Sequence, residues 1–150
     1  MGSLAIEFGT NCRISGQTTL TGRTASPEQP RLIVGNNVEI GWKTTIAVGT
    51  KVVIGDNVLI AGGAFLAGYP GHPIDPLQRS QNKPDTVDQI GDIILEDDVW
   101  LATGVAVLAG VRIGKGTIVT AGSVVFRDLP PGVIATGNPA RVVAPIAGNG

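Results

Sequence analysis

The sequence predicts an all-β fold in which a single chain winds into a parallel, three-sided coil. From Leu95 onward an aliphatic residue occupies every sixth position: Leu95, Leu101, Val107, Ile113, Val119 and Val125. A helix repeats its buried face every 3.6 residues and a strand every 2, so a sustained period of six indicates short flat strands separated by corners. Hexapeptide repeats of this kind are typical of a parallel β-helix.

A second pattern accompanies the first. A small or β-branched residue lies four positions after most of these aliphatic residues. These residues are Val99, Val105, Val111, Thr117 and Ser123, and we expect them to point inward. The position directly after an aliphatic residue is often glycine, as at Gly35, Gly41, Gly55 and Gly114. A tight corner explains this preference, since a larger side chain would clash there.

The same spacing extends upstream in three groups with shifted phase. They are Phe8, Ile14 and Leu20, then Val34, Ile40 and Ile46, then Ile54, Ile60 and Leu66. Since three hexapeptides form one triangular turn of about 18 residues, we expect about five stacked coils. The phase breaks at 25–33, at the extra pair Val52-Val53, and at 67–94. Insertions leave a solenoid as surface loops that commonly bind ligands, so 67–94 is predicted to be an extruded loop, with a short tail at the C-terminus.

Length and composition agree with one domain spanning residues 1–150. The chain has 43% hydrophobic residues and 22 glycines, which suits a thin core of small aliphatic side chains. The sequence shows neither a basic and apolar leader at its start nor an apolar run of about 18 residues. We therefore expect a cytoplasmic protein that does not span a membrane.

Composition also argues against several kinds of chemistry. Cys12 is the only cysteine and His72 the only histidine, so we expect no intramolecular disulfide and no metal site. Cys12 falls on an inward position and is predicted to be buried. A net charge of −1, with no basic stripe interleaved with aromatics, disfavours nucleic acid as a partner. The cationic C-terminal end, which includes Arg127 and Arg141, would suit a phosphorylated ligand.

The long break at 67–94 contains Gly71-His72-Pro73 and has four prolines, which limit backbone freedom. We therefore expect an ordered arm. A neutral imidazole can take a proton from a hydroxyl near physiological pH and return it later, which makes His72 a candidate general base. From the residues alone, a surface histidine with no chemical role remains the alternative.

Several segments together resemble the hexapeptide-repeat acyltransferases, most of all the branch of galactoside, maltose and xenobiotic O-acetyltransferases. They are Ile54-Gly55-Asp56-Asn57-Val58-Leu59-Ile60-Ala61, Gly71-His72-Pro73, Val99-Trp100-Leu101, Asp128-Leu129-Pro130-Pro131-Gly132 and Gly137-Asn138-Pro139-Ala140-Arg141-Val142. The resemblance covers the chain from about Val34 to Val143. It implies a left-handed β-helix, a homotrimer with active sites at subunit interfaces, and acetyl-coenzyme A as cosubstrate. Handedness follows from the resemblance alone, because crossovers between parallel strands are normally right-handed.

The resemblance also assigns roles to individual residues. His72 matches the catalytic base, which takes the proton of an acceptor hydroxyl as it attacks the thioester, without a covalent enzyme intermediate. The residues matched to coenzyme A binding are Trp100, Thr103, Ala121, Arg127 and Arg141. Thr103 and Ala121 would act through main-chain groups, and the arginines would bind phosphates through paired, charge-assisted hydrogen bonds. For Trp100, an aromatic that covers a subunit seam is the alternative.

The acceptor is less determined by the sequence. An asparagine that helps to hold sugars in the galactoside branch has no counterpart here, where the equivalent coil reads Gly41-Trp42-Lys43-Thr44. Trp42 could stack on a sugar or an aromatic acceptor, or fill a subunit seam. We expect an O-acetyltransferase that uses a sugar or sugar-containing small molecule. A xenobiotic acetyltransferase and a non-catalytic trimeric scaffold remain the alternatives. A γ-class carbonic anhydrase would need three histidines, and this chain has one.

Overall fold

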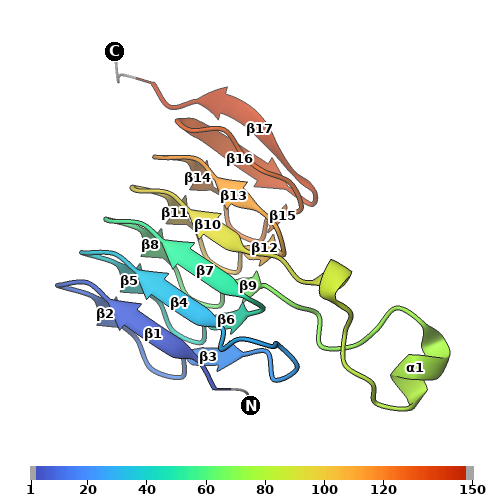
Figure 1. Ribbon diagram of the computed structural model, residues 1–150. Helices are drawn as coiled ribbons and strands as arrows, with labels where there is room; N and C mark the ends of the chain where they lie inside the picture. The colour runs from blue at the N-terminus through green and yellow to red at the C-terminus, as the bar shows by residue number, and fades with distance from the viewer. Residues whose placement is uncertain (1–2, 148–150) are drawn as a thin grey trace.

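The computed structural model describes residues 3–147, which wind into a stack of triangular coils (Figure 1). Each coil contributes one short strand to each of three sheets, which we call the first, second and third faces. Successive strands on a face are parallel, except for the last pair on the second face. The predicted all-β, parallel architecture is confirmed.

The strand order is β1-β4-β7-β10-β13 on the first face, β2-β5-β8-β11-β14-β16-β17 on the second and β3-β6-β9-β12-β15 on the third. The first face comprises β1 (Ala5–Phe8), β4 (Arg31–Val34), β7 (Lys51–Ile54), β10 (Ile93–Leu95) and β13 (Arg112–Ile113). The second comprises β2 (Arg13–Ile14), β5 (Glu39–Ile40), β8 (Leu59–Ile60), β11 (Trp100–Leu101), β14 (Ile118–Val119), β16 (Val133–Gly137) and β17 (Ala140–Pro145). The third comprises β3 (Thr19–Gly22), β6 (Thr45–Val48), β9 (Phe65–Ala67), β12 (Ala106–Leu108) and β15 (Val124–Val125).

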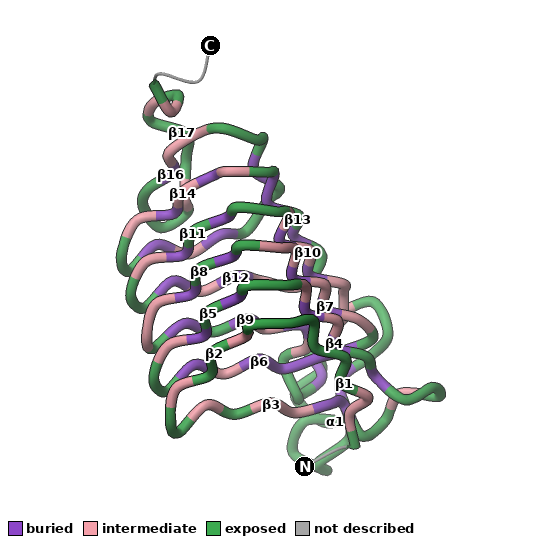
Figure 2. The backbone as a smooth tube through the Cα atoms, turned by 90° about the vertical axis from the view of Figure 1, so that its left-hand side faces the viewer, coloured by how far each residue is buried: buried purple, intermediate pink, exposed green. Residues whose placement is uncertain are grey.

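The core is a continuous column of aliphatic side chains inside the coil. Figure 2 shows the buried residues recurring along the backbone of successive coils. Residues of the sixfold repeat stack in register, as Ile60, Leu101 and Val119 do on the second face. The repeat positions Leu95, Leu101, Val107, Ile113, Val119 and Val125 are all fully buried. The positions four residues after them are buried as well, so both sequence patterns mark inward-facing residues.

The first coil is less well buried than the sequence predicted. Phe8 is 40% exposed and Ile14 is 45% exposed, and Cys12 is only partly buried. The reason is that these residues occupy the end of the stack, where the second coil covers them from one side alone. The Cys12 thiol nevertheless lies against that second coil, with Sγ 3.2 Å from the carbonyl oxygen of Gly35.

Corner glycines are required because the next coil lies directly against them. A Cβ atom on Gly55 would come within 2.8 Å of the amide nitrogen of Asp97, and one on Gly114 would come within 2.7 Å of the main chain at Pro131. Such separations are shorter than van der Waals contact. The expectation that bulk would clash at these corners is thus confirmed.

Replacing Gly55 by alanine is expected to destabilise the fold by about 1–3 kcal/mol, because the backbone of the neighbouring coil must move to admit a methyl group. Gly62→Ala is the matched control, since its Cβ would meet nothing closer than 3.1 Å. Thermal unfolding of both variants gives the comparison. Equal losses of stability at the two positions would contradict the packing explanation.

The phase breaks fall at the corner where the third face leads into the first. Loop 23–30 leaves the coil there, as does the segment between β9 and β10. The two additional residues that shift the phase do not lie where the sequence predicted them, at Val52-Val53. Val52 pairs in regular register with Leu32 and Ile93, so Val52-Val53 is ordinary strand and the additional pair lies between Ile46 and Val52.

The segment between β9 and β10 forms an arm that stands away from the coil (Figure 1). It contains the short helix α1 (Pro76–Ser80) and the 3-10 turn η1 (Val87–Gln89). Asp75 caps α1 by accepting a hydrogen bond from the Gln78 amide at 2.9 Å, and Arg79 donates to the carbonyl of Ile74 at 3.1 Å. The helical turns and these bonds give the arm a defined shape.

The C-terminal end forms a hairpin where the sequence predicted a short tail. Strands β16 and β17 pair antiparallel on the second face, with Thr136 opposite Arg141. The sixfold repeat ends at Val125, before both strands, so the repeat did not predict them. None of the helices in residues 3–147 has the length and apolar composition that a bilayer crossing needs.

Candidate functional site

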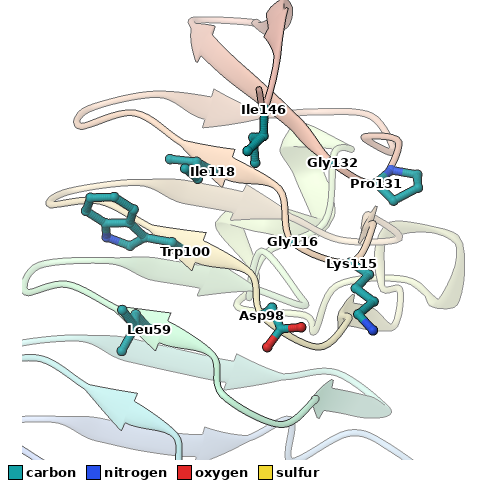
Figure 3. A pocket seen from close by; sticks show the side chains of 9 residues that line it. All are labelled: Leu59, Asp98, Trp100, Lys115, Gly116, Ile118, Pro131, Gly132 and Ile146. Atoms are coloured by element: carbon teal, nitrogen blue, oxygen red, sulfur yellow. The ribbon is translucent and has the colours of Figure 1, made fainter. Parts of the chain in front are cut away.

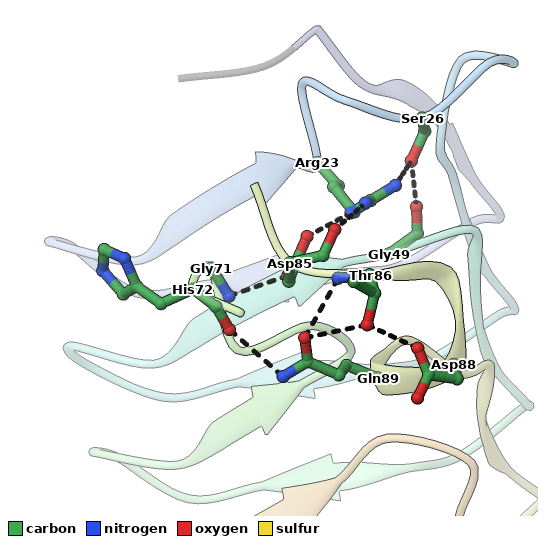
Figure 4. Close-up of polar contacts among 9 residues, drawn as sticks. All are labelled: Arg23, Ser26, Gly49, Gly71, His72, Asp85, Thr86, Asp88 and Gln89. Carbon is green, nitrogen blue, oxygen red and sulfur yellow. Dashed lines mark hydrogen bonds and ion pairs between the residues drawn. The ribbon is translucent and has the colours of Figure 1, made fainter. Parts of the chain in front are cut away.

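His72 lies on the first part of the arm, and its side chain is exposed. Its main chain is fixed on both sides. The Gly71 amide donates a hydrogen bond to Asp85 Oδ2 at 2.8 Å, and the His72 carbonyl accepts one from Gln89 Nε2 at 3.1 Å. Figure 4 shows the imidazole ring pointing away from these contacts, so it is presented to the outside.

The hollow beside His72 has a volume of about 410 Å³. Loop 23–25 lines one side of it, and the arm lines the other with Gly71, His72 and residues 82–85. Lys83 brings a positive charge to this hollow, and Asn82 brings an amide. The space can therefore admit a polar small molecule next to the imidazole.

Beneath this hollow lies a buried ion pair between Arg23 and Asp85. The side chains are 5% and 2% exposed, and Arg23 Nε is 2.6 Å from Asp85 Oδ1. A second guanidinium nitrogen of Arg23 donates to the Asp85 carbonyl at 2.6 Å. The pair joins the arm to the loop that follows β3.

Three of the predicted site residues share one column at the corner between the second and third faces. The Trp42 carbonyl accepts from Gly63 at 2.7 Å, that of Gly62 accepts from Gly104 at 3.0 Å, and that of Thr103 accepts from Gly122 at 2.8 Å. These bonds place Trp42, Gly62, Thr103 and Ala121 at equivalent positions of successive coils. Within residues 3–147, the N–H groups of Thr103 and Ala121 make no hydrogen bond, so both remain free to bind a ligand.

Trp100 lies on the outer surface of the second face, between Leu59 and Ile118 (Figure 3). It is 45% exposed and borders a hollow of about 690 Å³ that Lys115 and Ile146 also line. The surroundings are largely apolar. They suit a ligand's alkyl arm or the surface of a neighbouring subunit.

Arg127 and Arg141 meet at one hollow, although 14 positions separate them in the sequence. Arg127 follows β15 and Arg141 lies on β17, and the C-terminal hairpin brings them together with Phe126 and Pro139. The hollow has a volume of about 290 Å³. Two guanidinium groups beside an aromatic ring form a donor set that suits phosphate oxygens and a stacked base.

The predicted residues thus fall into separate groups within one chain. His72 is on the arm at the corner between the third and first faces, whereas Thr103 and Ala121 are at the corner between the second and third. Among the described residues, no group of three or more His, Cys, Asp or Glu side chains is arranged to hold a metal ion.

The residues that hold the arm were not predicted from the sequence; they are Arg23, Asp85 and Gln89. Arg23 and Asp85 are 62 positions apart and both lie in irregular loops, so no periodicity links them. The available signal for Gln89 was the Thr-x-x-Gln spacing at 86–89, which forms a capping box in η1.

No family model matches the chain, but it is similar to several acetyltransferases. The Saccharomyces cerevisiae protein YJL218W, provisionally named an acetyltransferase, is 41% identical over 117 residues, which are 77% of this chain and 56% of that protein. The galactoside O-acetyltransferase of Escherichia coli K12 is 35% identical over 113 residues, 75% of this chain and 53% of that enzyme. The chain spans about half the length of these relatives.

A solved structure of the hexapeptide-repeat-containing acetyltransferase VCA0836 from Vibrio cholerae, complexed with acetyl-coenzyme A, is also similar. It has a TM-score of 0.61 and 27% identity, and the match covers 94% of this chain and 66% of that one. Fold and repeats together define a hexapeptide-repeat β-helix protein. The chain is similar to hexapeptide-repeat acetyltransferases, among them galactoside and maltose O-acetyltransferases.

Proposed function

We propose that the protein is an acetyl-coenzyme A-dependent O-acetyltransferase that acts on a hydroxyl of a sugar or sugar-containing molecule. The observation that supports this most is the placement of the only histidine. His72 stands exposed on an ordered arm, next to a polar hollow, with its backbone held from both sides. The acetyltransferase names of the relatives point to the same reaction class.

In the proposed mechanism His72 takes the proton of the acceptor hydroxyl as its oxygen attacks the thioester carbonyl, and returns that proton to the coenzyme A thiolate that leaves when the C–S bond breaks. General base catalysis of this kind contributes about 10²–10⁴-fold to the rate. The rest would come from holding both substrates in reach of each other and from N–H groups that stabilise negative charge on the carbonyl oxygen. Acetyl-coenzyme A supplies the activated acyl group when it is bound.

The residues present fit the donor. The free N–H groups of Thr103 and Ala121 lie on a single column, so they can bind successive amide carbonyls of an extended chain. Arg127 and Arg141 converge on one hollow and would bind the phosphates. Trp100 would lie along the same apolar surface, either against the ligand or against a second subunit.

The separation of the two groups within one chain supports an assembly of several copies. His72 can reach Thr103 and Ala121 only if the arm of one copy lies against the second–third corner of another. The surfaces next to that corner are apolar, with Leu59, Phe65 and Trp100 each more than 40% exposed. We therefore retain the homotrimer, with left-handed coils and a cytoplasmic location, as part of the proposal.

The acceptor is the least determined part of the proposal. Trp42 is 63% exposed at the same corner as Thr103 and Ala121, and its ring covers Gly16, where a Cβ would lie 2.9 Å from the indole. An exposed indole can stack on the apolar face of a sugar ring or on an aromatic acceptor. The second possibility keeps a xenobiotic as the alternative acceptor.

The proposed function is tested by measuring thiol released from acetyl-coenzyme A over a panel of sugars, nucleotide sugars and antibiotics. Turnover with a sugar hydroxyl is expected, and mass spectrometry of the product identifies an O-acetyl ester. Turnover with antibiotics alone would favour the xenobiotic alternative. Absence of coenzyme A binding would favour a scaffold without catalysis.

Replacing Arg127 by alanine is expected to weaken acetyl-coenzyme A about 10-fold, because one charge-assisted contact to phosphate is lost. The loss should be smaller for dephospho-coenzyme A, which lacks the 3′-phosphate. Calorimetric titration of the wild type and the variant with each ligand measures the two losses of affinity. An equal loss for both would assign Arg127 to another part of the ligand.

A further inference from the structure

We propose that Arg23, Asp85 and Gln89 are positioning residues for His72, which fix the backbone of the arm so that the imidazole stays aimed at the acceptor. The inference rests on the proposed function, since it concerns the same site. It assigns a purpose to a buried ion pair that the chemistry itself does not use. The contacts that carry it are drawn in Figure 4.

Asp85 is the centre of the arrangement because each carboxylate oxygen has its own partner. Oδ1 accepts from Arg23 Nε at 2.6 Å, and Oδ2 accepts from the Gly71 amide at 2.8 Å. With only 2% of its side chain exposed, the carboxylate has no competing contact with solvent. The residue before the catalytic histidine is therefore tied to a fixed, desolvated group.

Arg23 connects this carboxylate to the coil. Its amide donates to the Val48 carbonyl at 2.9 Å, and its guanidinium lies 3.4 Å from Ser26 Oγ. Ser26 Oγ in turn donates to the Gly49 carbonyl at 2.9 Å. The arm is thus anchored through Arg23 to the first two coils of the stack.

Gln89 holds the other side of the same short segment. Its Nε2 donates to the His72 carbonyl at 3.1 Å, while its Oε1 accepts from the Thr86 amide at 3.0 Å. The side chain is itself held by η1, so it is a rigid contact. Together, Asp85 and Gln89 fix the N–H of Gly71 and the C=O of His72, which flank the histidine's own α-carbon from both directions.

Stability alone does not explain this pair. Replacing a buried ion pair by well-packed apolar residues is often neutral or stabilising, because burying two charges costs desolvation energy. An apolar pair, however, could not accept the directed hydrogen bond from Gly71. A displacement of a reacting group by about 1 Å can cost about 10²-fold in rate, so a catalytic arm gains from such a bond.

The first test uses Gln89→Glu, which keeps the side-chain length and the acceptor for Thr86 but removes the donor to His72. We expect kcat to fall about 10-fold while the Kd for acetyl-coenzyme A and the melting temperature stay unchanged. Gln78→Glu is the matched control, because Gln78 is exposed on the same arm and its side chain makes no hydrogen bond within residues 3–147. The control should keep the wild-type kcat.

The second test uses the double variant Arg23→Met/Asp85→Leu, which removes the buried charges together and keeps the volume filled. We expect a folded protein with normal acetyl-coenzyme A affinity, a kcat at least about 10-fold lower, and faster hydrogen exchange of the Gly71 amide. The exchange measurement does not depend on activity. Wild-type kcat in both Gln89→Glu and the double variant would overturn the inference.

These outcomes are distinguishable from failure of the proposed function. If His72→Ala leaves turnover unchanged in the same assay, the proposed function fails. If His72→Ala abolishes turnover while Gln89→Glu and the double variant match the wild type, only the positioning role fails. Slower turnover in the double variant with an unchanged pH profile supports positioning, since that variant leaves the His72 side chain itself unaltered.

Discussion

The variant His72→Ala is expected to lower turnover by about 10²-fold or more while leaving the Kd for acetyl-coenzyme A within about twofold of the wild type. The alanine removes the only imidazole in the chain, so no other histidine can take its place. The donor contacts proposed for Thr103, Ala121 and Arg127 lie elsewhere on the coil. Steady-state thiol release and equilibrium titration with coenzyme A measure the two quantities separately.

Because His72 is exposed, its replacement should not disturb the core. The melting temperature is the control, together with Gln78→Ala on the same arm, which should retain full turnover. If His72→Ala kept the wild-type rate, the histidine would have no part in the reaction. A parallel loss of coenzyme A affinity would instead place the ring in donor binding.

The single variant Arg23→Met is expected to lower the free energy of unfolding by about 3–5 kcal/mol. It leaves the Asp85 carboxylate buried without its cationic partner, and the lost Coulombic attraction no longer offsets the cost of desolvation. Denaturant unfolding of the wild type and the variant measures the difference.

The double variant Arg23→Met/Asp85→Leu is the comparison for Arg23→Met, because it removes both buried charges. It should recover most of the lost stability because no unpaired charge remains. A double variant as unstable as Arg23→Met would show that the pair contributes through packing rather than charge. In that case the ion pair would not be retained for its bond to Gly71.

The sequence predicted the coil well because each inward position is set by local geometry. A strand two or three residues long can bury one side chain per face, so Leu101, Val107 and Ile113 had to recur every sixth residue. The corner glycines followed from the same geometry. The phase shift was mislocated because Val52 and Val53 look alike in sequence, and only their pairing shows which of the residues before Val52 are additional.

The candidate site was only partly predictable. His72 and the two arginines belong to short motifs, so the resemblance could mark them. The contacts that hold His72 join loops far apart in the chain, and neither Arg23 nor Asp85 belongs to a repeat. Exposure of Phe8 and Cys12 was also missed, because a period of six does not tell which coil ends the stack.

The proposed reaction requires that His72 of one copy serve a donor groove on another. Mixed assemblies of His72→Ala with Ala121→Trp, which would block the groove, test this directly. Each parent should be nearly inactive. In a closed trimer, every mixed assembly has one site built from an intact arm and an intact groove, so random mixing should restore about a quarter of the wild-type activity. Mixtures that stay as inactive as their parents would contradict the account.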